Sequence, residues 1–209
     1  MPQKPHHQLE AQFFSQGDSI IAGVDEAGRG CLAGPVFAAA VVLPWNEDFS
    51  GLNDSKKLTP ARRDFWFNQI CSRALDYGVA SVDSEEIDRI NILKASHKAM
   101  ELAVRQLKSV PHLCLVDGPL PFSKEYKQHC VVGGDAISIS IAAASVLAKV
   151  SRDRWITRIS AEFPGFSFRE HKGYGTAEHL AALERYGPSP IHRQSFGPVR
   201  KLLRSWKHC

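Results

Sequence analysis

The 209-residue sequence predicts an α/β protein in which strands and helices alternate along much of the chain. Short apolar runs bounded by glycine, proline or charged residues are typical of buried strands, and several such runs occur. Longer segments between them carry apolar residues at helical spacing, which favours amphipathic helices. The length suits one domain with a substantial core, so we expect residues 1–209 to form a single domain.

Composition narrows the class of protein further. The chain is 44% hydrophobic and 23% charged, which is typical of a soluble globular protein. No apolar run reaches the roughly 18 residues that span a bilayer, and the first residues lack the apolar segment of a secretory signal. We therefore expect a cytoplasmic protein without a membrane anchor. The five cysteines include no C-x-x-C pair, which argues against a zinc ribbon or a disulfide framework.

The first third of the chain predicts two strands and a helix. Residues 1–18 are polar, and we expect a tail or a short helix there. Residues 20–24 (IIAGV) and 36–43 (VFAAAVVL) are predicted as strands, and the short connection suggests antiparallel neighbours. Thr59 then suits a helix N-cap, and Pro60 suits the first position of a helix that reaches about residue 75.

The middle of the chain continues the alternation. Residues 77–82 predict a third strand, and the acids at 83–86 suit a helix start. Apolar residues recur at helical spacing over residues 91–108, which predicts an amphipathic helix. Residues 113–116 (LCLV) predict a fourth strand, and residues 126–132 are the candidate for a fifth.

The last third is predicted to be helical. A long apolar helix is expected over about residues 136–163, with Asp135 at or near its N-cap. Thr176 is expected to cap a helix that reaches about residue 186, and residues 202–206 suit a final docked helix. We expect residues 164–209 to form a basic, helical C-terminal part.

Charge is distributed unevenly along the chain. Residues 149–209 hold 12 Lys and Arg against 5 Asp and Glu, whereas residues 1–148 hold 14 against 17. A basic part beside an acidic part suits a polyanion held across a metal site. A solvated basic face is the alternative, and charge alone does not separate the two.

Four acids follow strands or begin a helix. Asp25 and Glu26 come directly after the first strand, Asp117 follows the fourth, and Asp135 precedes the long helix. Acids at the ends of neighbouring strands converge at one edge of a sheet. Ligation by oxygen alone favours Mg²⁺ or Mn²⁺ over zinc, and two such ions suit in-line phosphoryl displacement.

Alternatives stay open for these acids. Asp25 and Glu26 also suit solvated turn residues, and capping is a structural role for Asp135. Consecutive residues of a regular strand point to opposite faces. Either the strand breaks at Glu26, or Glu26 acts from a different side than Asp25.

Lys56 and Lys57 stand just before the predicted helix N-terminus at Pro60. Free N–H groups at a helix N-terminus favour an anion, so a phosphate contact is one interpretation. An exposed lysine pair is the other.

The order of short motifs resembles the ribonuclease HII family, the bacterial type 2 ribonucleases H, from about residue 20 to 203. The matching blocks are GVDEAGRG (23–30), NDSKKLTP (53–60), VDG (116–118), IAAASVLAKVSRD (141–153), HKGYGT (171–176) and HR-SF-PV (192–199). Several blocks in the right order are far more specific than a lone D-E or G-x-G. Gly133 and Cys31 depart from the pattern, where lysine and proline are common.

The resemblance implies a ribonuclease H-like fold: a mixed five-stranded sheet flanked by helices, with a helical C-terminal extension. It implies an endonuclease that hydrolyses the RNA strand of RNA–DNA hybrids and incises 5′ of single ribonucleotides in duplex DNA. The products carry 3′-hydroxyl and 5′-phosphate ends, and the role is removal of ribonucleotides and RNA primers. A divalent metal, Mg²⁺ or Mn²⁺, and a monomeric protein are expected.

The resemblance also assigns residues to roles. The four catalytic, metal-binding acids of the family fall on Asp25, Glu26, Asp117 and Asp135. The loop whose backbone reads the ribose 2′-hydroxyl falls on Gly28, Arg29 and Gly30, and the tyrosine that packs on the next sugar falls on Tyr174. Substrate-binding candidates with either a contact or a supporting role are Lys56, Lys57, His171, Lys172, Arg193 and Ser195.

Three other functions compete with this hypothesis. A ribonuclease HIII would share the acids but carry an extra N-terminal domain and lack the Gly-Arg-Gly loop; only 19 residues precede Ile20. A DNA-only nuclease of the same superfamily would have no use for a loop that reads a 2′-hydroxyl. A non-catalytic nucleic-acid-binding module would not need all four acids.

Overall fold

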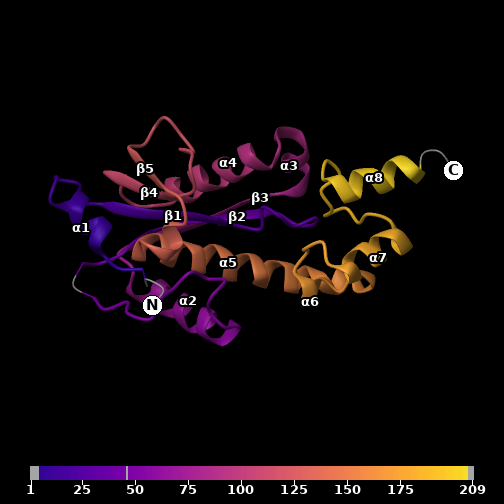
Figure 1. Cartoon of the computed structure of the whole chain (residues 1–209), viewed down its shortest axis with the longest axis horizontal. Coiled ribbons are helices and arrows are strands. Elements are labelled where there is room, and N and C mark those ends of the chain that lie inside the picture. Colours follow the sequence, from indigo (N-terminus) through magenta and orange to yellow (C-terminus); the bar gives the residue numbers. More distant parts are fainter. Residues whose placement is uncertain (1–4, 46, 207–209) are drawn as a thin grey trace.

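A computed structural model describes residues 5–45 and 47–206, and a five-stranded mixed sheet lies at its centre (Figure 1). The order across the sheet is β3-β2-β1-β4-β5. The antiparallel pairs are β1–β2 and β2–β3, and the parallel pairs are β1–β4 and β4–β5. The predicted α/β class and the mixed five-stranded sheet are confirmed. The strands are β1 Ile21–Ala27, β2 Val36–Val42, β3 Asp76–Val82, β4 Leu113–Asp117 and β5 Gln128–Val131.

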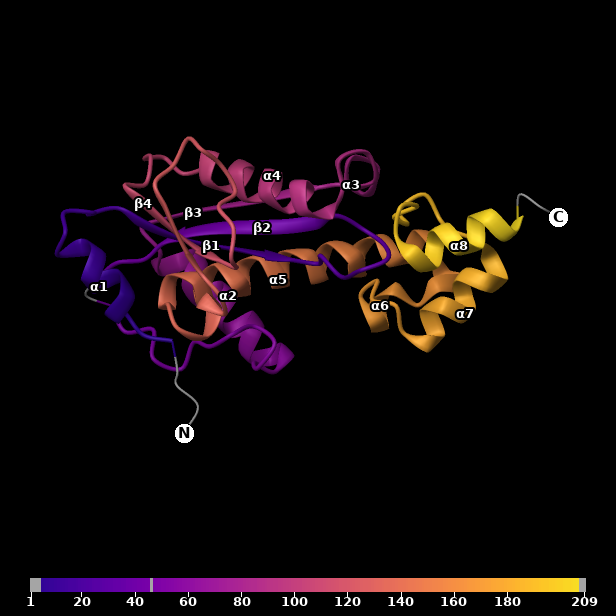
Figure 2. The ribbon, with the colours of Figure 1, turned by 45° about the horizontal axis from the view of Figure 1, so that its top comes forward.

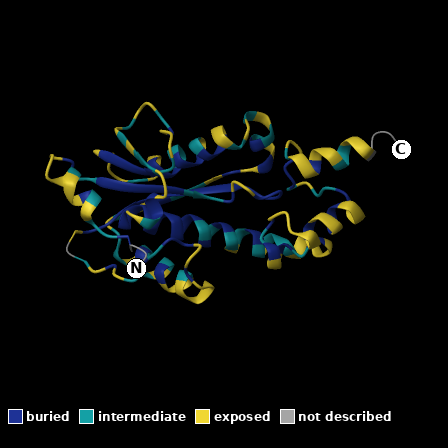
Figure 3. Cartoon of the chain, viewed as in Figure 1, coloured by how far each residue is buried: buried dark blue, intermediate teal, exposed yellow. Residues whose placement is uncertain are grey.

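Helices cover both faces of the sheet (Figures 1 and 2). Helix α4 packs on one face, α5 packs on the other, and α2 lies on the outer side of α5. Figure 3 shows β1, β2 and much of α5 as buried, whereas α7 and α8 keep exposed faces. The helices are α1 Gln8–Phe14, α2 Pro60–Arg73, α3 Ser84–Ile90, α4 Ile92–Arg105, α5 Ile139–Ile159, α6 Phe168–His171, α7 Ala177–Tyr186 and α8 Gly197–Trp206.

Strand β2 is apolar throughout because both of its faces are buried. Ala39 and Val41 pack into the core cluster beneath α5. The alternating residues Ala38 and Ala40 pack into the cluster beneath α4. A strand that is buried on both faces shows no polar alternation, and small side chains let both helices approach closely.

Two helix starts follow the predicted chemistry. The Thr59 side chain accepts a hydrogen bond from Arg62 N, with Pro60 as the first residue of α2. Thr176 caps α7 in the same way through His179 N. Helices α3 and α4 meet at Asn91, whose φ of 72° breaks the helical path and whose side chain caps α4 through Lys94 N.

The expected N-cap role of Asp135 is wrong. Asp135 lies in a short 3₁₀ turn, Gly134–Ala136, and α5 begins only at Ile139. The cap is Ser138, whose hydroxyl accepts a hydrogen bond from Ile141 N at 3.2 Å. The Asp135 carboxylate is therefore not used as a cap.

The N-terminal segment is docked rather than loose. Glu10 of α1 is only 2% exposed, and its Oε1 accepts hydrogen bonds from Ser138 Oγ at 2.6 Å and Ser140 N at 3.0 Å. Helix α1 thereby covers the start of α5. Residues 1–4 of the predicted tail lie outside the described residues.

Helices α6, α7 and α8 gather beyond one end of the sheet, where α5 reaches them (Figure 2). The connection from β1 to β2 also reaches this region: Leu32 N donates to Gly173 O, and Arg193 N donates to Leu32 O, both at 2.8 Å. The loop after β1 is thus tied to the C-terminal part. Within the described part of the chain, no helix is long and apolar enough to cross a membrane.

Candidate active site

The ends of two strands and a turn bring the predicted acids into one region. Strands β1 and β4 are parallel neighbours with Val24 paired to Val116. Asp25 and Asp117 are the next residues of the two strands, so they lie side by side. Asp117 Oδ1 accepts a hydrogen bond from Gly134 N at 2.7 Å, which holds the turn that carries Asp135. A Cβ on Gly134 would lie 2.6 Å from the terminal Cδ1 of Ile141, so a larger residue there would make that side chain shift.

The environment of the acids opposes their negative charge. Burial raises the pKa of Asp25 well above its usual range, and the charges of Glu26 and Asp117 raise it further. Burial, together with the Asp54 and Asp117 charges, raises the pKa of Asp135 to about 6. Burial also raises the pKa of Glu26, partly offset by Arg29. Crowded, desolvated carboxylates are unfavourable unless a cation compensates them.

Asp54 is a fifth acid that the sequence reading did not single out. It is 8% exposed, and its Oδ1 accepts a hydrogen bond from Lys56 N at 2.9 Å. The negative charge of Asp54 also raises the pKa of Asp135, after burial, so the two carboxylates lie near each other. In the sequence, the signal that could have pointed to Asp54 is its position just before the lysine pair. Its approach to the other acids depends on how the loop before α2 packs in the folded protein, which local sequence does not show.

Glu26 occupies a different side of β1 from Asp25. The strand continues to Ala27, so it does not break at Glu26. Asp25 is close enough to Ser145 of α5 for that hydroxyl to act on its pKa, whereas Glu26 lines a hollow of about 80 Å³ together with Asp117 and His97 of α4. Arg29 Nη1 donates to Glu26 Oε1 at 2.9 Å and holds the carboxylate there.

In residues 5–45 and 47–206, no three carboxylate, histidine or cysteine side chains are arranged so that they hold a metal ion. The side-chain types nevertheless fit a hard cation, because every candidate donor is a carboxylate oxygen. The pKa values of Asp25, Glu26 and Asp135 are raised first by burial and then by neighbouring acids, and a cation would offset both causes. In this structure the Glu26 carboxylate is paired with Arg29.

The Gly28–Gly30 turn presents backbone at the surface. Gly28 has a φ of +94°, and a Cβ there would fall 2.0 Å from Arg152 Nε. Both features require glycine. Arg29 and Gly30 are exposed, and a Cβ on Gly30 would meet no atom within 4 Å. The turn therefore leaves open space beside its backbone, close to Glu26.

Tyr174 lies on the C-terminal side of this turn. It is 40% exposed, and its backbone N–H donates to His171 O at 2.9 Å. Lys149 Nζ lies 5.5 Å and the Arg152 guanidinium 5.9 Å from the ring centroid. Part of the ring is thus supported by cations, and the rest faces solvent.

The two lysines before α2 differ in their surroundings. The Lys56 charge lowers the pKa of both Glu26 and Asp135, so its ammonium group faces the acids. Lys57 Nζ lies 3.8 Å from Asp54 Oδ2, and both lysines are exposed. Of the pair, Lys56 is the one whose charge acts on Glu26 and Asp135.

The other four substrate-binding candidates have supporting contacts in the structure. His171 is buried and stacks on His179 with ring centroids 4.3 Å apart. Lys172 Nζ donates to Thr157 Oγ1 at 2.8 Å. Ser195 Oγ donates to Asp88 of α3 at 2.5 Å, and Arg193 is fully buried behind the turn. The geometry favours support over direct contact for these residues.

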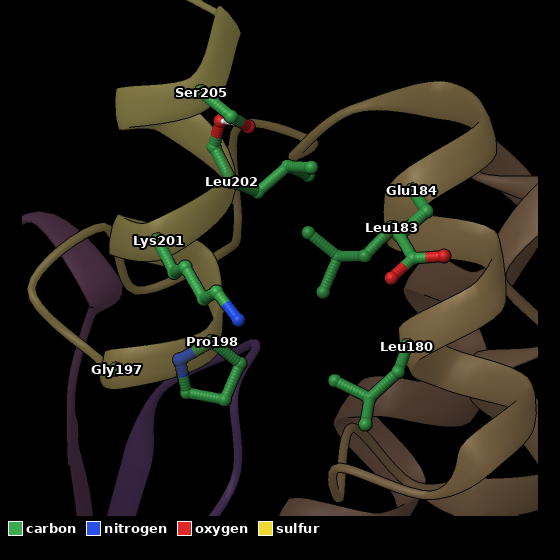
Figure 4. Close-up of a pocket in the computed structure, with 8 residues that line it drawn as sticks. All are labelled: Leu180, Leu183, Glu184, Gly197, Pro198, Lys201, Leu202 and Ser205. Carbon is green, nitrogen blue, oxygen red and sulfur yellow. Dashed lines mark hydrogen bonds between the residues drawn. The ribbon is translucent and has the colours of Figure 1, made fainter.

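A separate groove of about 480 Å³ lies between α7 and α8, and none of the four predicted acids lines it (Figure 4). Leu180 and Leu183 of α7 face Leu202 of α8 across it, with Lys201 and Glu184 at its sides. It is mostly apolar and belongs to the C-terminal part. The four described cysteines are all free, as expected from their spacing.

A mixed sheet with acids at the ends of two adjacent parallel strands defines a hydrolase of the ribonuclease H-like class. The family model of ribonuclease HII matches residues 22–199. Ribonuclease HII of Geobacter sulfurreducens is 52% identical over 202 residues, which cover 97% of this chain and 93% of the relative. The corresponding protein of Caldicellulosiruptor bescii is 49% identical over 191 residues, covering 91% of this chain and 93% of that one.

Solved structures agree with the sequence relatives. The crystal structure of ribonuclease H2 from Pyrococcus horikoshii superposes with a TM-score of 0.71 at 26% identity, covering 90% of this chain and 99% of that chain. The chain belongs to the ribonuclease HII family. It is therefore a ribonuclease H, an endoribonuclease among the hydrolases, as the motif order predicted.

Proposed function

We propose that this enzyme hydrolyses the RNA strand of RNA–DNA hybrids and incises 5′ of single ribonucleotides in duplex DNA. The products would carry 3′-hydroxyl and 5′-phosphate ends. One observation supports the proposal: the buried Asp25 and the half-buried Glu26 are followed within β1 and its turn by the open backbone of Gly28–Gly30. Bond cleavage and recognition of the sugar would then occur beside each other.

Asp25, Glu26, Asp117 and Asp135 would hold Mg²⁺ or Mn²⁺, and Asp54 would support Asp135. When bound, two such ions supply a reactive water and stabilise the leaving oxygen in an in-line displacement. The protein's own contribution is to hold the carboxylates desolvated and close together, so that a bound cation would offset the burial and the mutual repulsion that raise their pKa values. Lys56 adds a positive charge on the same side, as its effect on Glu26 and Asp135 indicates.

The turn would select RNA through its backbone. A 2′-hydroxyl both donates and accepts hydrogen bonds, and it is what separates RNA from DNA at a given nucleotide. The side-chain-free edge at Gly30 leaves room for a sugar. Tyr174 would pack on the sugar of the following deoxynucleotide, since its ring is partly exposed on the other side of the turn.

The basic C-terminal part, about residues 164–209, would bind the nucleic-acid backbone as part of one catalytic domain. Twelve cationic against five acidic residues over 149–209 suit a polyanion. We expect a monomer that acts in the cytoplasm on RNA–DNA hybrids and on ribonucleotide-containing DNA, in replication and repair.

Three matched duplexes test the proposal: one with a single ribonucleotide, one RNA–DNA hybrid and one of DNA alone, each incubated with Mg²⁺ or Mn²⁺. We expect cuts in the first two, with the single-ribonucleotide duplex opened on the 5′ side of that nucleotide. An uncut ribonucleotide duplex contradicts the incision activity. Cutting of the DNA duplex would instead favour a DNA nuclease of the same superfamily.

A further inference from the structure

Arg152 of α5 is a buried arginine between the turn and Tyr174. It is 1% exposed, and each nitrogen of its guanidinium donates to a backbone carbonyl. Nη2 bonds Ala33 O at 3.2 Å and Nε bonds Pro35 O at 3.3 Å, both in the loop after β1. Nη1 bonds Lys172 O at 2.9 Å, two residues before Tyr174.

The same guanidinium touches both proposed recognition elements. Its Nε lies where a Cβ of Gly28 would be, at 2.0 Å, so the turn rests directly on it. On its other side it lies 5.9 Å from the Tyr174 ring centroid. The planar guanidinium of Arg152 therefore lies between the turn and Tyr174 and contacts both.

Packing alone does not account for an arginine here. A buried guanidinium is unfavourable unless its donors are satisfied, and an apolar side chain would fill the space without that penalty. Only the arginine fork donates in several fixed directions at once. Its three acceptors belong to two chain segments about 140 residues apart in sequence, so the fork fixes their separation.

Arg193 supports the same turn from the C-terminal part. It is fully buried, with Nη1 donating to Arg29 O and Nε donating to Gly34 O, both at 2.9 Å. It holds the turn but does not reach Tyr174 in these contacts. Arg152 is thus the link between the two elements, and Arg193 acts on one of them.

We propose that Arg152 is a positioning residue that sets the separation between the Gly28–Gly30 turn and Tyr174, and so sets the preference for a ribonucleotide followed by a deoxyribonucleotide. The inference rests on the proposed function, because it assigns a cause to the selectivity of that site. Arg152 does not touch the substrate. It acts through the two elements that do.

The test is a selectivity ratio: kcat/KM on a duplex with one ribonucleotide divided by kcat/KM on a uniform RNA–DNA hybrid. Arg152→Lys keeps the charge but loses the fork. We expect the ratio to fall about tenfold or more. The value of kcat/KM on the uniform hybrid should change much less. Arg154→Lys is the matched control, since Arg154 lies on the same helix and pairs with Asp64 at the surface; its ratio should stay at the wild-type value.

A double-mutant cycle separates positioning from a general structural role. If Arg152 acts through Tyr174, then Arg152→Lys should change the ratio little in a Tyr174→Ala background. A full tenfold effect in that background, or an unchanged ratio in the single variant, overturns the inference. Failure of the wild-type enzyme to cut the single-ribonucleotide duplex would instead overturn the proposed function.

Gly173→Ala provides a second route should Arg152→Lys fail to fold, as judged by near-UV circular dichroism. Its Cβ would fall 2.8 Å from Ala33 O and 3.4 Å from Arg152 Nη2, at a φ of +82°. The added methyl group would push the segment of Gly173 away from the loop of Ala33 while the Arg152 guanidinium stays in place. The inference expects the same loss of ratio, and an unchanged ratio in this variant contradicts it.

Discussion

Asp25 and Glu26 are consecutive in β1, yet their carboxylates lie on opposite sides of the sheet. Asp25 contacts Ser145 of α5, and Glu26 lies beside His97 of α4. The charge of Asp117 contributes to raising the pKa of both Asp25 and Glu26, so the end of β4 lies near both carboxylates. The site is therefore assembled around a strand edge, with one acid reaching it from each face.

Asp25→Asn should abolish cleavage and leave the fold intact. Loss of one ligand removes several kcal/mol of transition-state stabilisation, so we expect activity to fall by about three orders of magnitude. Because burial and neighbouring acids oppose the Asp25 charge, the neutral variant should melt at the same temperature as wild type or higher without metal. Hybrid binding should persist, and Mn²⁺ affinity by calorimetry should drop.

Asp64→Asn is the control for that experiment, because Asp64 is exposed and pairs only at the surface with Arg154. It should keep activity and Mn²⁺ binding. Unfolded Asp25→Asn protein, or undiminished Mn²⁺ affinity, would count against the assignment of Asp25 to a metal site.

Tyr174→Ala should reduce cleavage at ribonucleotide–deoxyribonucleotide junctions more than cleavage of uniform hybrids. Loss of an aromatic packing surface is worth about 1–3 kcal/mol, so a tenfold effect on junction substrates is expected. Tyr186→Ala is the control, since Tyr186 is a similarly exposed tyrosine on α7. Equal losses on both substrates would refute the sugar-packing role.

Two buried histidines predict an acid-sensitive C-terminal part. Burial lowers the pKa of His179 and His192 to about 4, and their Nε2 atoms share a 2.9 Å hydrogen bond. Between about pH 6.5 and pH 4 the unfolded chain takes up protons at these histidines, whereas the folded chain does not. The free energy of unfolding therefore falls as the pH falls. Hydrogen exchange in α7 should accelerate over that range.

His179→Gln should flatten this pH dependence, because it removes one of the titrating groups. His112→Gln is the control, since His112 is exposed near the start of β4. Exchange in α7 that does not change between pH 6.5 and 4 would contradict the role of the histidines.

Gly23→Ala should destabilise the protein and displace the acids. A Cβ at this position would lie 2.1 Å from the Ser140 carbonyl carbon, so β1 and α5 would have to separate. Overpacking of this kind costs about 1–3 kcal/mol, which urea unfolding measures. Gly197→Ala, where a Cβ meets no atom within 4 Å, should leave stability nearly unchanged; a similar loss in both variants would argue against tight β1–α5 packing.

The strands could be predicted because apolar runs mark them along the chain. The approach of Asp25 to Asp117 could also be predicted, because acids at the ends of neighbouring parallel strands lie at one edge of the sheet. The metal-binding roles of the four acids stay predictions. The start of α5 was misplaced because Asp135 and Ser138 are both good N-caps, and local pattern does not choose between them. Asp54 and Arg152 were missed because their partners lie about 80 to 120 residues away in sequence.

We propose that one 2′-hydroxyl, recognised beside Asp25 and Glu26, determines where the strand is cut. Three duplexes that differ at one nucleotide, carrying ribose, deoxyribose or 2′-O-methylribose, test this directly with Mg²⁺ or Mn²⁺. We expect a single cut 5′ of the ribose-containing nucleotide and none in the other two. Comparable cutting of the deoxyribose or 2′-O-methyl duplex at that position would contradict it.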